Sequence, residues 1–315
     1  MSYTIIVDSV ACIPNSELKK RSIKVLPLKI SLDGKHYLDR TSDKQLLPFY
    51  SNQIIKNARK AFSVTPTEND MVNYALKRVA PYYDQALVLT IAKEYSPIYY
   101  RCIDAAVRVS EEAEEGRRAR GKESVFVLSC KDSGSVAAGQ GLVALYADNL
   151  LRDGMSFASL TSSLDTFSSN VKSLTIISDS VFIRQQVKAK GNKTMSYPAA
   201  LLSNAIGIAP IANNQNGEID ILARTSIGLQ NSINRVFDYC IDRLEEGLHT
   251  PIINVSYSGN IVCLKRLQSY FRLKRACDDA GVKLLIGTMT LAAGVNLGTK
   301  AISVGIAPIN QTATP

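Results

Sequence analysis

Side chains that carry hydroxyl groups recur in four short segments at the ends of predicted strands. Hydroxyls at the carboxyl ends of strands, together with the free amides at helix N-termini, can hold an anion such as a carboxylate. The same residue types are ordinary N-caps of helices, so each segment taken singly also fits a structural role. Their convergence favours an anion site. The four segments are Asp8-Ser9, Ser63-Val64-Thr65-Pro66-Thr67, Ser96-Pro97 and Asp132-Ser133-Gly134-Ser135.

The sequence motifs of the common enzyme classes are absent. The chain has two histidines, His36 and His249, and neither lies in a cysteine or acidic pattern typical of a metal site. It contains no G-x-S-x-G elbow, no Walker A loop and no G-x-G-x-x-G after a strand. The sequence therefore predicts a binding protein without metal or cofactor. The alternative is a small-molecule phosphotransfer enzyme in which Asp8 or Asp132 binds a metal or acts as a base.

The elements that must position these segments alternate between strand and helix in the first half. Short apolar runs rich in β-branched residues are separated by helical patterns near 97–115 and 136–154. Runs buried on both faces are typical of a parallel sheet covered by helices, so we expect an α/β domain. Asp33-Gly34, between alternating apolar and polar residues, predicts a β-hairpin. The predicted strands are Thr4–Val7, Ile23–Leu28, Ala86–Thr90 and Ser124–Leu128.

A second α/β domain is expected after about residue 168, with no long linker before it. The run Asn213-Asn214-Gln215-Asn216-Gly217 predicts a turn, and an amphipathic pattern near 226–246 predicts a long helix. Two domains joined in this way share a cleft, which is where ligands commonly bind. The remaining predicted elements are strands at Leu174–Ile177, Ile252–Val255, Val282–Ile286 and near 300–306, and helices at Pro198–Ala205 and near 260–280.

Composition and charge indicate a folded protein with room for about two domains. The chain has 315 residues, of which 46% are hydrophobic and 21% charged. Its formal net charge of +9 is dispersed, without a basic block interleaved with aromatics, which argues against nucleic-acid binding but leaves transient contact with an anionic membrane surface open. The six cysteines are scattered and fit buried free thiols. Because no secretory signal pattern is present, we expect a cytoplasmic protein.

The hydroxyl segments and several others resemble, in order along the chain, the DegV family of bacterial fatty-acid-binding proteins. Each motif is short, and their order and spacing make the match specific. The resemblance continues weakly through Ala205–Ile211 and from Gly294 to Gly305. The segments that carry the main part of the resemblance are Asp8 to Pro14, Val25-Leu26-Pro27-Leu28, Asp33 to Asp39, the Ser63–Thr67 loop, Ser96 with Tyr99, and Asp132-Ser133 followed by Gly139-Gln140-Gly141.

The resemblance implies a fold of two α/β domains with one fatty acid held between them. Residues 1–168 would form the first domain, with a mostly parallel sheet flanked by helices and with the loops that bind the carboxylate. Residues 169–315 would form the second, with an apolar tunnel for the acyl chain. The carboxylate-binding residues implied are Ser63, Thr65, Thr67 and Ser96, and the implied site loops contain Asp8, Ser9, Asp132, Ser133, Lys193 and Thr194.

The chain departs from the family pattern at several of these positions. Val64 stands where the family has a serine, and Pro97 and Ile98 replace a glycine and a threonine. The family's arginine becomes Thr194, and the adjacent Lys193 supplies a charge without the planar, bidentate geometry of arginine. The segment Gly294-Val295-Asn296-Leu297-Gly298 has no histidine where the family has one.

By resemblance, such proteins are the acyl-carrying subunits of bacterial fatty acid kinase and perform no catalysis alone. They present a bound long-chain fatty acid to an ATP-binding partner, which phosphorylates its carboxylate for phospholipid synthesis. The changed positions keep an alternative open, a lipid carrier or sensor that takes no part in the kinase reaction. Apolar runs such as Ala199-Ala200-Leu201-Leu202 and Leu291-Ala292-Ala293 are candidates for the tunnel lining or for ordinary core.

Overall fold

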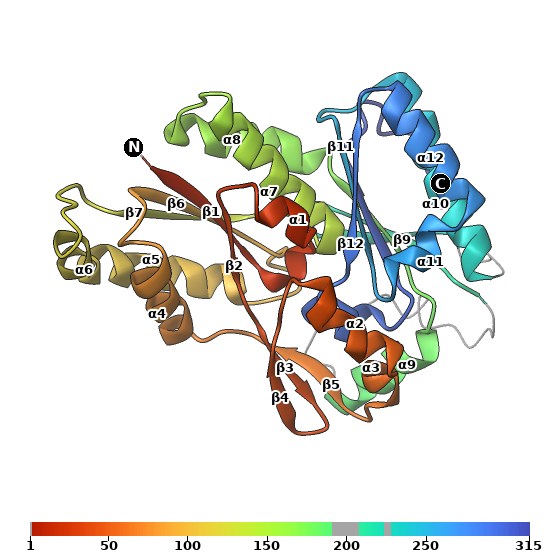
Figure 1. Cartoon of the computed structure of the whole chain (residues 1–315), viewed down its shortest axis with the longest axis horizontal. Helices are drawn as coiled ribbons and strands as arrows, with labels where there is room; N and C mark the ends of the chain where they lie inside the picture. Colours follow the sequence, from red (N-terminus) through yellow and green to blue (C-terminus); the bar gives the residue numbers. More distant parts are fainter. Residues whose placement is uncertain (1, 191–207, 224–227) are drawn as a thin grey trace.

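A four-stranded parallel sheet forms the centre of the first half of the chain (Figure 1). The structure is a computed structural model and describes residues 2–190, 208–223 and 228–315. The strands lie in the order β2-β1-β6-β7, and every neighbouring pair is parallel, which confirms the predicted sheet. The strands are β1 (Tyr3–Asp8), β2 (Ile23–Leu26), β6 (Gln85–Thr90) and β7 (Val127–Asp132).

The predicted fourth strand begins too early in the sequence. Ser124–Leu128 was the expected run, but β7 starts at Val127. Ser124 is held instead by Arg117, a buried side chain whose guanidinium donates to the Ser124 carbonyl at 2.8 Å and to its hydroxyl at 2.8 Å. Ser124 therefore lies outside the ladder with β6, whose first pair is Gln85 with Val127. Strand β2 also ends earlier than predicted, at Leu26, because Pro27 lacks the N–H that a sheet ladder needs.

Helices cover both faces of this sheet, because its strands are apolar on both sides. Ile6 and Val88 face the core beneath α4 (Glu68–Arg78) and α5 (Ile98–Glu112). Ile5 and Leu87, one residue earlier on each strand, face the core beneath α7 and α8. The remaining helices of these layers are the short η1, α1 and α6. The bounds not yet given are η1 (Ser9–Ala11), α1 (Asn15–Leu18), α6 (Glu114–Arg118), α7 (Ala137–Arg152) and α8 (Phe157–Ser169).

A small antiparallel sheet, in the order β4-β3-β5, projects from the first half toward the second (Figure 1). Asp33 and Gly34 form its turn with φ of 50° and 82°, which is the geometry that a two-residue hairpin requires. The predicted hairpin is therefore confirmed. The elements of this region are β3 (Lys29–Leu32), β4 (Lys35–Leu38), α2 (Asp43–Ser51), α3 (Ile54–Asn57) and β5 (Ala61–Val64).

A six-stranded mixed sheet, in the order β10-β9-β8-β13-β11-β12, forms the second half. Among the described strands of this sheet, β11 and β12 are the one parallel pair. Helices α10 and α12 cover one face. The bounds are β8 (Lys172–Ile176), α9 (Ser180–Lys190), β9 (Ile211–Gln215), β10 (Glu218–Ala223), α10 (Leu229–Glu246), β11 (Ile252–Tyr257), α11 (Ile261–Lys265), α12 (Gln268–Asp279), β12 (Lys283–Thr288), α13 (Leu291–Leu297) and β13 (Ile302–Ile306).

The predicted turn at residues 213–217 is shorter than expected. Only Asn216 and Gly217 form the turn, with φ of 53° and 78°. Asn213 and Asn214 are strand residues because β9 lies between β8 and β10, and both neighbours pair with it. The predicted helix at Pro198–Ala205 lies outside the described residues.

Helix α7 lies between the two large sheets and has contacts with both. Its first turns approach their neighbours closely. A Cβ on Gly139 would lie 2.2 Å from the Ser135 hydroxyl, and one on Gly141 would lie 2.2 Å from the Ala11 carbonyl oxygen. Only glycine allows a backbone approach this close.

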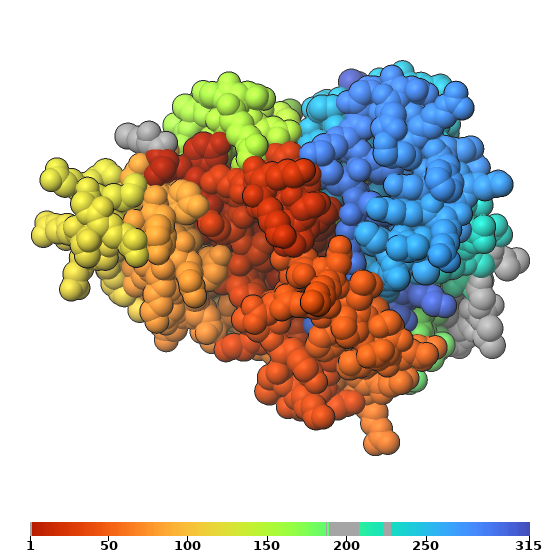
Figure 2. All heavy atoms as spheres, in the orientation of Figure 1, coloured from red at the N-terminus to blue at the C-terminus, as the bar shows by residue number. Residues whose placement is uncertain are grey.

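The two halves touch over a broad area. In the space-filling view the segments coloured red and orange lie directly against those coloured blue (Figure 2). The second large sheet begins at Lys172, just after α8. The domain boundary near residue 168 stays a prediction. Within the described residues, no helix has the length and apolar character needed to cross a membrane.

Candidate binding pocket between the two halves

A pocket lies where the two large sheets and the small sheet meet. Its lining is mostly apolar, with two separate clusters of polar side chains. The apolar part comes from both halves of the chain. It consists of Val10, Leu28, Ile91, Ile98, Val136, Ala137, Ala212, Ile219, Ala292, Ala293 and Leu297.

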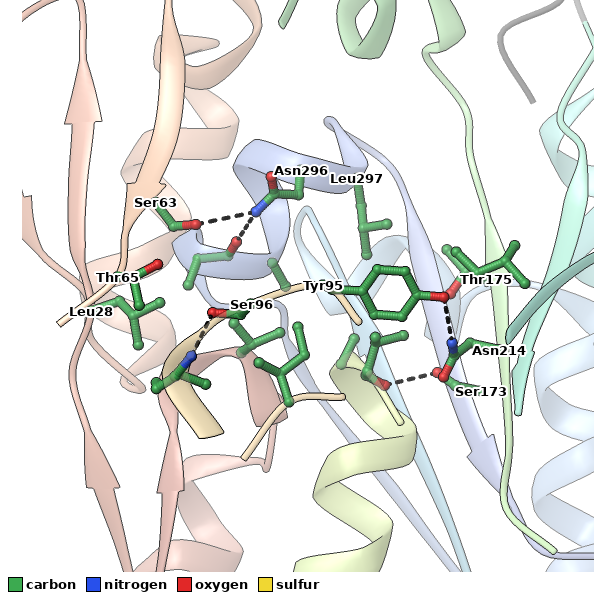
Figure 3. Close-up of a pocket in the computed structure, with 18 of the residues that line it drawn as sticks. Leu28, Ser63, Thr65, Tyr95, Ser96, Ser173, Thr175, Asn214, Asn296 and Leu297 are labelled. Carbon is green, nitrogen blue, oxygen red and sulfur yellow. Dashed lines mark hydrogen bonds between the residues drawn. The ribbon is translucent and has the colours of Figure 1, made fainter. Parts of the chain in front are cut away.

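Three of the predicted carboxylate-binding residues, Ser63, Thr65 and Ser96, line the pocket and gather on one side of it (Figure 3). Ser63 lies near the end of β5, and its hydroxyl accepts a hydrogen bond from the Asn296 amide at 3.4 Å. The Ser96 hydroxyl accepts from the Ile98 amide at 3.4 Å, at the start of α5. The hydroxyls of Ser63, Thr65 and Ser96 form the first polar cluster, which we call the hydroxyl end.

The loop that carries Thr65 is held by α5. The Arg101 guanidinium donates to the carbonyl oxygens of Thr65 and Pro66, at 3.3 and 2.8 Å. Because these bonds use the backbone of the loop, the Thr65 side chain stays available to the pocket. It forms no hydrogen bond with another residue of the described part of the chain.

The fourth predicted carboxylate-binding residue, Thr67, lies outside the pocket lining and is exposed. It is the N-cap of α4. Its hydroxyl accepts from the Asp70 amide at 3.1 Å and donates to the Asp70 carboxylate at 2.9 Å, while the Thr67 amide donates to that carboxylate at 3.0 Å. This reciprocal pair is a capping box, the structural role that a threonine before a helix often has.

Asp8 and Ser9 lie beneath the pocket and fix the loops that line it. The buried Asp8 carboxylate accepts hydrogen bonds from the Val10 amide at 3.0 Å, the Ile91 amide at 2.8 Å and the Gln140 side chain at 2.9 Å. Burial raises the pKa of Asp8, and these three donors oppose that rise. The Ser9 hydroxyl accepts from the Leu28 amide at 3.1 Å.

Asp132 and Ser133 shape the turn before α7. The Asp132 carboxylate accepts from the Gly134 amide at 2.9 Å, and burial raises the pKa of this carboxyl. The Ser133 hydroxyl accepts from the Ser135 amide and donates to its carbonyl, both at 3.2 Å. Neither residue lines the pocket. Lys193 and Thr194 lie outside the described residues.

The second cluster of polar side chains was not predicted from the sequence. It comes from β8, β9 and the loop after β6. Tyr95 lies across the pocket, and its hydroxyl reaches the β9–β10 hairpin (Figure 3). There it donates to the Gly217 carbonyl at 2.5 Å and accepts from the Asn214 amide at 3.0 Å. Burial raises the pKa of Tyr95 to about 12, so the hydroxyl stays protonated at neutral pH. We call this second cluster the amide end; it consists of Ser173, Thr175, Asn214 and the Tyr95 hydroxyl.

Part of the amide end left a signal in the sequence. Ser173 and Thr175 alternate with Leu174 and Ile176, the period of a strand with one polar and one apolar face. The polar face of a buried strand is a candidate for ligand contact. Asn214 was hidden by its position in a run of asparagines that also fits a turn.

Helix α13 is placed against the first half by Asp39. The carboxylate of this buried residue accepts from the amides of Leu291 and Ala292, both at 2.9 Å. Burial raises the pKa of Asp39 to about 6. Tyr50 adds a second link, since its hydroxyl contacts the carbonyls of Met289 and Thr290 at 2.9 and 3.0 Å. These contacts bring Ala292, Ala293 and Asn296 into the lining.

The described lining offers hydroxyl, phenol and amide groups among apolar side chains, which is the chemistry of a site for an amphiphilic small molecule. Within the described residues, no three cysteine, histidine or acidic side chains gather as a metal site would require.

Comparison with known proteins agrees with this geometry. The family profile described as "Uncharacterised protein, DegV family" matches residues 2–308. A DegV domain-containing protein of Xanthomonas axonopodis pv. citri is 27% identical, over 98% of each chain. The crystal structure of a DegV lipid-binding protein from Thermotoga maritima superposes with a TM-score of 0.74 at 20% identity, over 98% of this chain and 99% of that one.

A stearic acid-binding protein from Eubacterium ventriosum also has this fold. It superposes with a TM-score of 0.73 at 19% identity, over 97% of this chain and 98% of that one. Because the family profile spans nearly the whole sequence, the chain belongs to the DegV family.

Proposed function

We propose that the protein binds one long-chain fatty acid in the pocket between its two halves. The observation that carries this proposal is the gathering of Ser63, Thr65 and Ser96, from two separate segments, at one end of a mostly apolar pocket. Hydroxyl donors can hold a carboxylate there, and the Asn296 amide orients Ser63 by donating to its hydroxyl, which leaves the hydroxyl hydrogen for the ligand. The stearic acid-binding relative with the same fold supports the same ligand class.

The apolar lining would supply most of the affinity. Burial of an alkyl chain is worth about 0.8 kcal/mol per methylene before the costs of ordering are subtracted. Two or three hydrogen bonds to the carboxyl group would then fix the direction of the chain.

The hydrogen bonding of the acidic residues supports binding over phosphotransfer. Asp8 accepts three hydrogen bonds from the protein's own donors, and Asp132 holds the Gly134 amide. Neither lines the pocket, so neither is placed to hold a metal or act as a base for a ligand bound there.

We further propose that the protein presents the carboxyl group to an ATP-binding kinase subunit. A second candidate is a carrier or sensor outside that reaction. It is favoured by Asn296, which lines the pocket in the segment where the family has a histidine. The amide of this residue can donate to a carboxylate but carries no charge and no acid–base function.

The first experiment is to purify the protein from a bacterial host and identify bound lipid by mass spectrometry under denaturing conditions. We expect one equivalent of a long-chain fatty acid. A folded protein that carries no fatty acid, and takes none up when titrated, would contradict the proposal.

A second experiment separates the kinase subunit from the carrier. The loaded protein is incubated with an ATP-binding fatty acid kinase subunit, and acyl phosphate is measured. Formation of acyl phosphate supports the kinase role, whereas tight binding without acyl phosphate supports the carrier.

A further inference from the structure

The amide end of the pocket does not suit a plain hydrocarbon chain. Ser173 and Thr175 project from β8 onto the same face of the sheet as Ala212 and Asn214 on β9, because Ser173 pairs with Asn214 and Thr175 with Ala212. All four residues line the pocket. The wall that the second sheet offers to a ligand is therefore largely polar (Figure 3).

Two hydroxyl groups at the amide end already have hydrogen-bond partners within the protein. The Ser173 hydroxyl donates to the Val136 carbonyl at 2.8 Å and lies 3.3 Å from the Ser303 hydroxyl. The Tyr95 hydroxyl is occupied by Gly217 and Asn214.

Two other polar groups at the amide end lack a hydrogen-bond partner among the described residues. The Asn214 side chain is 3% exposed, and its Oδ1 has no hydrogen-bond partner in the described part of the chain. The positions of Oδ1 and Nδ2 cannot be exchanged. Nδ2 donates to the Glu218 carbonyl oxygen at 3.3 Å, and that oxygen can only accept. Thr175 is 5% exposed, and its hydroxyl forms no hydrogen bond with any other described residue. An acceptor and a hydroxyl therefore both point to a missing polar partner.

One hydroxyl group on the ligand could satisfy both. Thr175 and Asn214 are diagonal neighbours on an antiparallel pair, and such Cα atoms lie about 7–8 Å apart, so a single small group fits between the side chains. The hydroxyl would donate to Asn214 Oδ1 and accept from the Thr175 hydroxyl. A plain methylene in this position would leave both groups buried and unpaired, which weakens binding.

We propose that the preferred ligand is a fatty acid with a hydroxyl group on its chain, and that Asn214 and Thr175 bind this hydroxyl. This inference rests on the proposed fatty-acid function. Tyr95 and Ser96 are adjacent in sequence, with Ser96 at the hydroxyl end and the Tyr95 hydroxyl at the amide end. The two ends are thus separated by about the length of a tyrosine side chain. The ligand's hydroxyl accordingly belongs along the chain and not beside the carboxyl group.

The test compares affinities of the delipidated full-length protein by calorimetric titration. The ligands are octadecanoic acid and two hydroxyoctadecanoic acids. One has its hydroxyl beside the carboxyl group, and the other, here called the mid-chain hydroxy acid, has it about the length of a tyrosine side chain further along. We expect the mid-chain hydroxy acid to bind about tenfold more tightly than octadecanoic acid. Thr175→Val keeps the shape of the side chain and removes its hydroxyl, and it should reduce this ratio to near one.

Asn214→Leu should abolish the same preference, and Asn213→Leu is its matched control. Asn213 is the neighbouring residue on β9, and it faces the opposite side of the sheet, so its replacement should leave the ratio unchanged. Thr175→Val keeps the test valid if Asn214→Leu fails to fold.

The outcomes are distinct. Equal or weaker binding of the mid-chain hydroxy acid would overturn the inference and leave the proposed function standing. A preference that survives in both Thr175→Val and Asn214→Leu would also overturn it, since other residues would then bind the hydroxyl. Failure of all three acids to bind would overturn the proposed function itself, and the inference with it.

Discussion

The Tyr95 hydroxyl donates a hydrogen bond of 2.5 Å to the carbonyl of Gly217 and so joins the loop after β6 to the β9–β10 hairpin across the pocket. The hairpin is fixed a second time, since the Gly217 amide donates to the Gly134 carbonyl at 2.8 Å. One turn of the second sheet is thus held between two loops of the first. These bonds close one side of the pocket.

Replacement of Tyr95 by phenylalanine removes the hydroxyl from this junction and leaves the ring in place. We expect Tyr95→Phe to lower the free energy of unfolding by about 1–2 kcal/mol and to speed the release of bound fatty acid, because the hairpin loses both hydrogen bonds that the Tyr95 hydroxyl forms, with Gly217 and with Asn214. Stopped-flow displacement measures the release. Tyr100→Phe, at an exposed residue of α5, is the control. Equal release rates in both variants would show that the Tyr95 bond does not retain the ligand.

Removal of two hydroxyls tests the hydroxyl end. The double variant Ser63→Ala with Ser96→Ala should weaken the binding of a free fatty acid by about 1–3 kcal/mol, the usual loss for hydrogen bonds to a charged group. Thr67→Ala is the matched control, because it removes a hydroxyl from the same loop outside the pocket. It should lower the free energy of unfolding by about 1 kcal/mol through loss of the N-cap while leaving affinity intact. Unchanged affinity in the double variant would reject the carboxylate assignment.

The pH dependence of stability should reveal Asp39. Its pKa rises from an ordinary 3.8 to about 6 on folding, so the folded protein holds this proton more tightly than the unfolded chain does. The resulting stabilisation is fully present below pH 3.8 and is lost as the pH rises through about 6. It amounts to at most about 3 kcal/mol.

Asp39→Asn should remove this dependence. Denaturant unfolding between about pH 4 and 7 should show the free energy of unfolding rising less steeply toward acid in the variant than in the natural protein. The slopes are compared, because the amide also loses one of the two acceptors that hold α13. Asp8, whose pKa is also raised, contributes equally to both proteins. Parallel curves would rule out Asp39 as the source.

Filling the pocket from α13 should change the preferred chain length. Ala293→Leu places a larger side chain in the lining and should favour shorter fatty acids over longer ones. Ala105→Leu is the comparison, because Ala105 lines a separate small apolar cavity between α4, α5 and the first sheet. Affinities for a series of chain lengths report the effect. A chain-length preference that is the same in both variants would place the acyl chain away from Ala293.

Local signals explain what could be predicted of the fold. The hairpin at Asp33-Gly34 depends on two residues and their immediate neighbours, and the buried strands are continuous apolar runs. The start of β7 depends on Arg117, whose side chain reaches the Ala80 carbonyl and Asp84 as well as Ser124, and no local pattern contains that contact. From sequence alone Thr67 fits either a ligand contact or a helix N-cap, and the structure shows it as the N-cap of α4.

The site divides in the same way. Ser63, Thr65 and Ser96 follow from a rule about loops at strand ends, which needs only the order of strands along the sequence. Asn214 and Thr175 meet the pocket because of the register between β8 and β9, which is set by long-range pairing. Tyr95 meets Asn214 because its side chain reaches from the loop after β6 to the β9–β10 hairpin. Such residues become visible once the two sheets are placed together.

The glycines of α7 have a consequence for how a ligand enters. Gly139 and Gly141 press the helix backbone against both large sheets, and Gly305 on β13 completes the contact, since its Cβ would lie 2.4 Å from the Ala138 carbonyl oxygen. A hinge motion that parted the sheets would separate these packed backbones and expose the buried pair of Asp8 and Gln140. Such a motion is far costlier than a local one. For the proposed fatty acid we therefore expect exchange through brief openings at the rim of the pocket, at a rate set by the stability of a few loop residues while the two halves stay together.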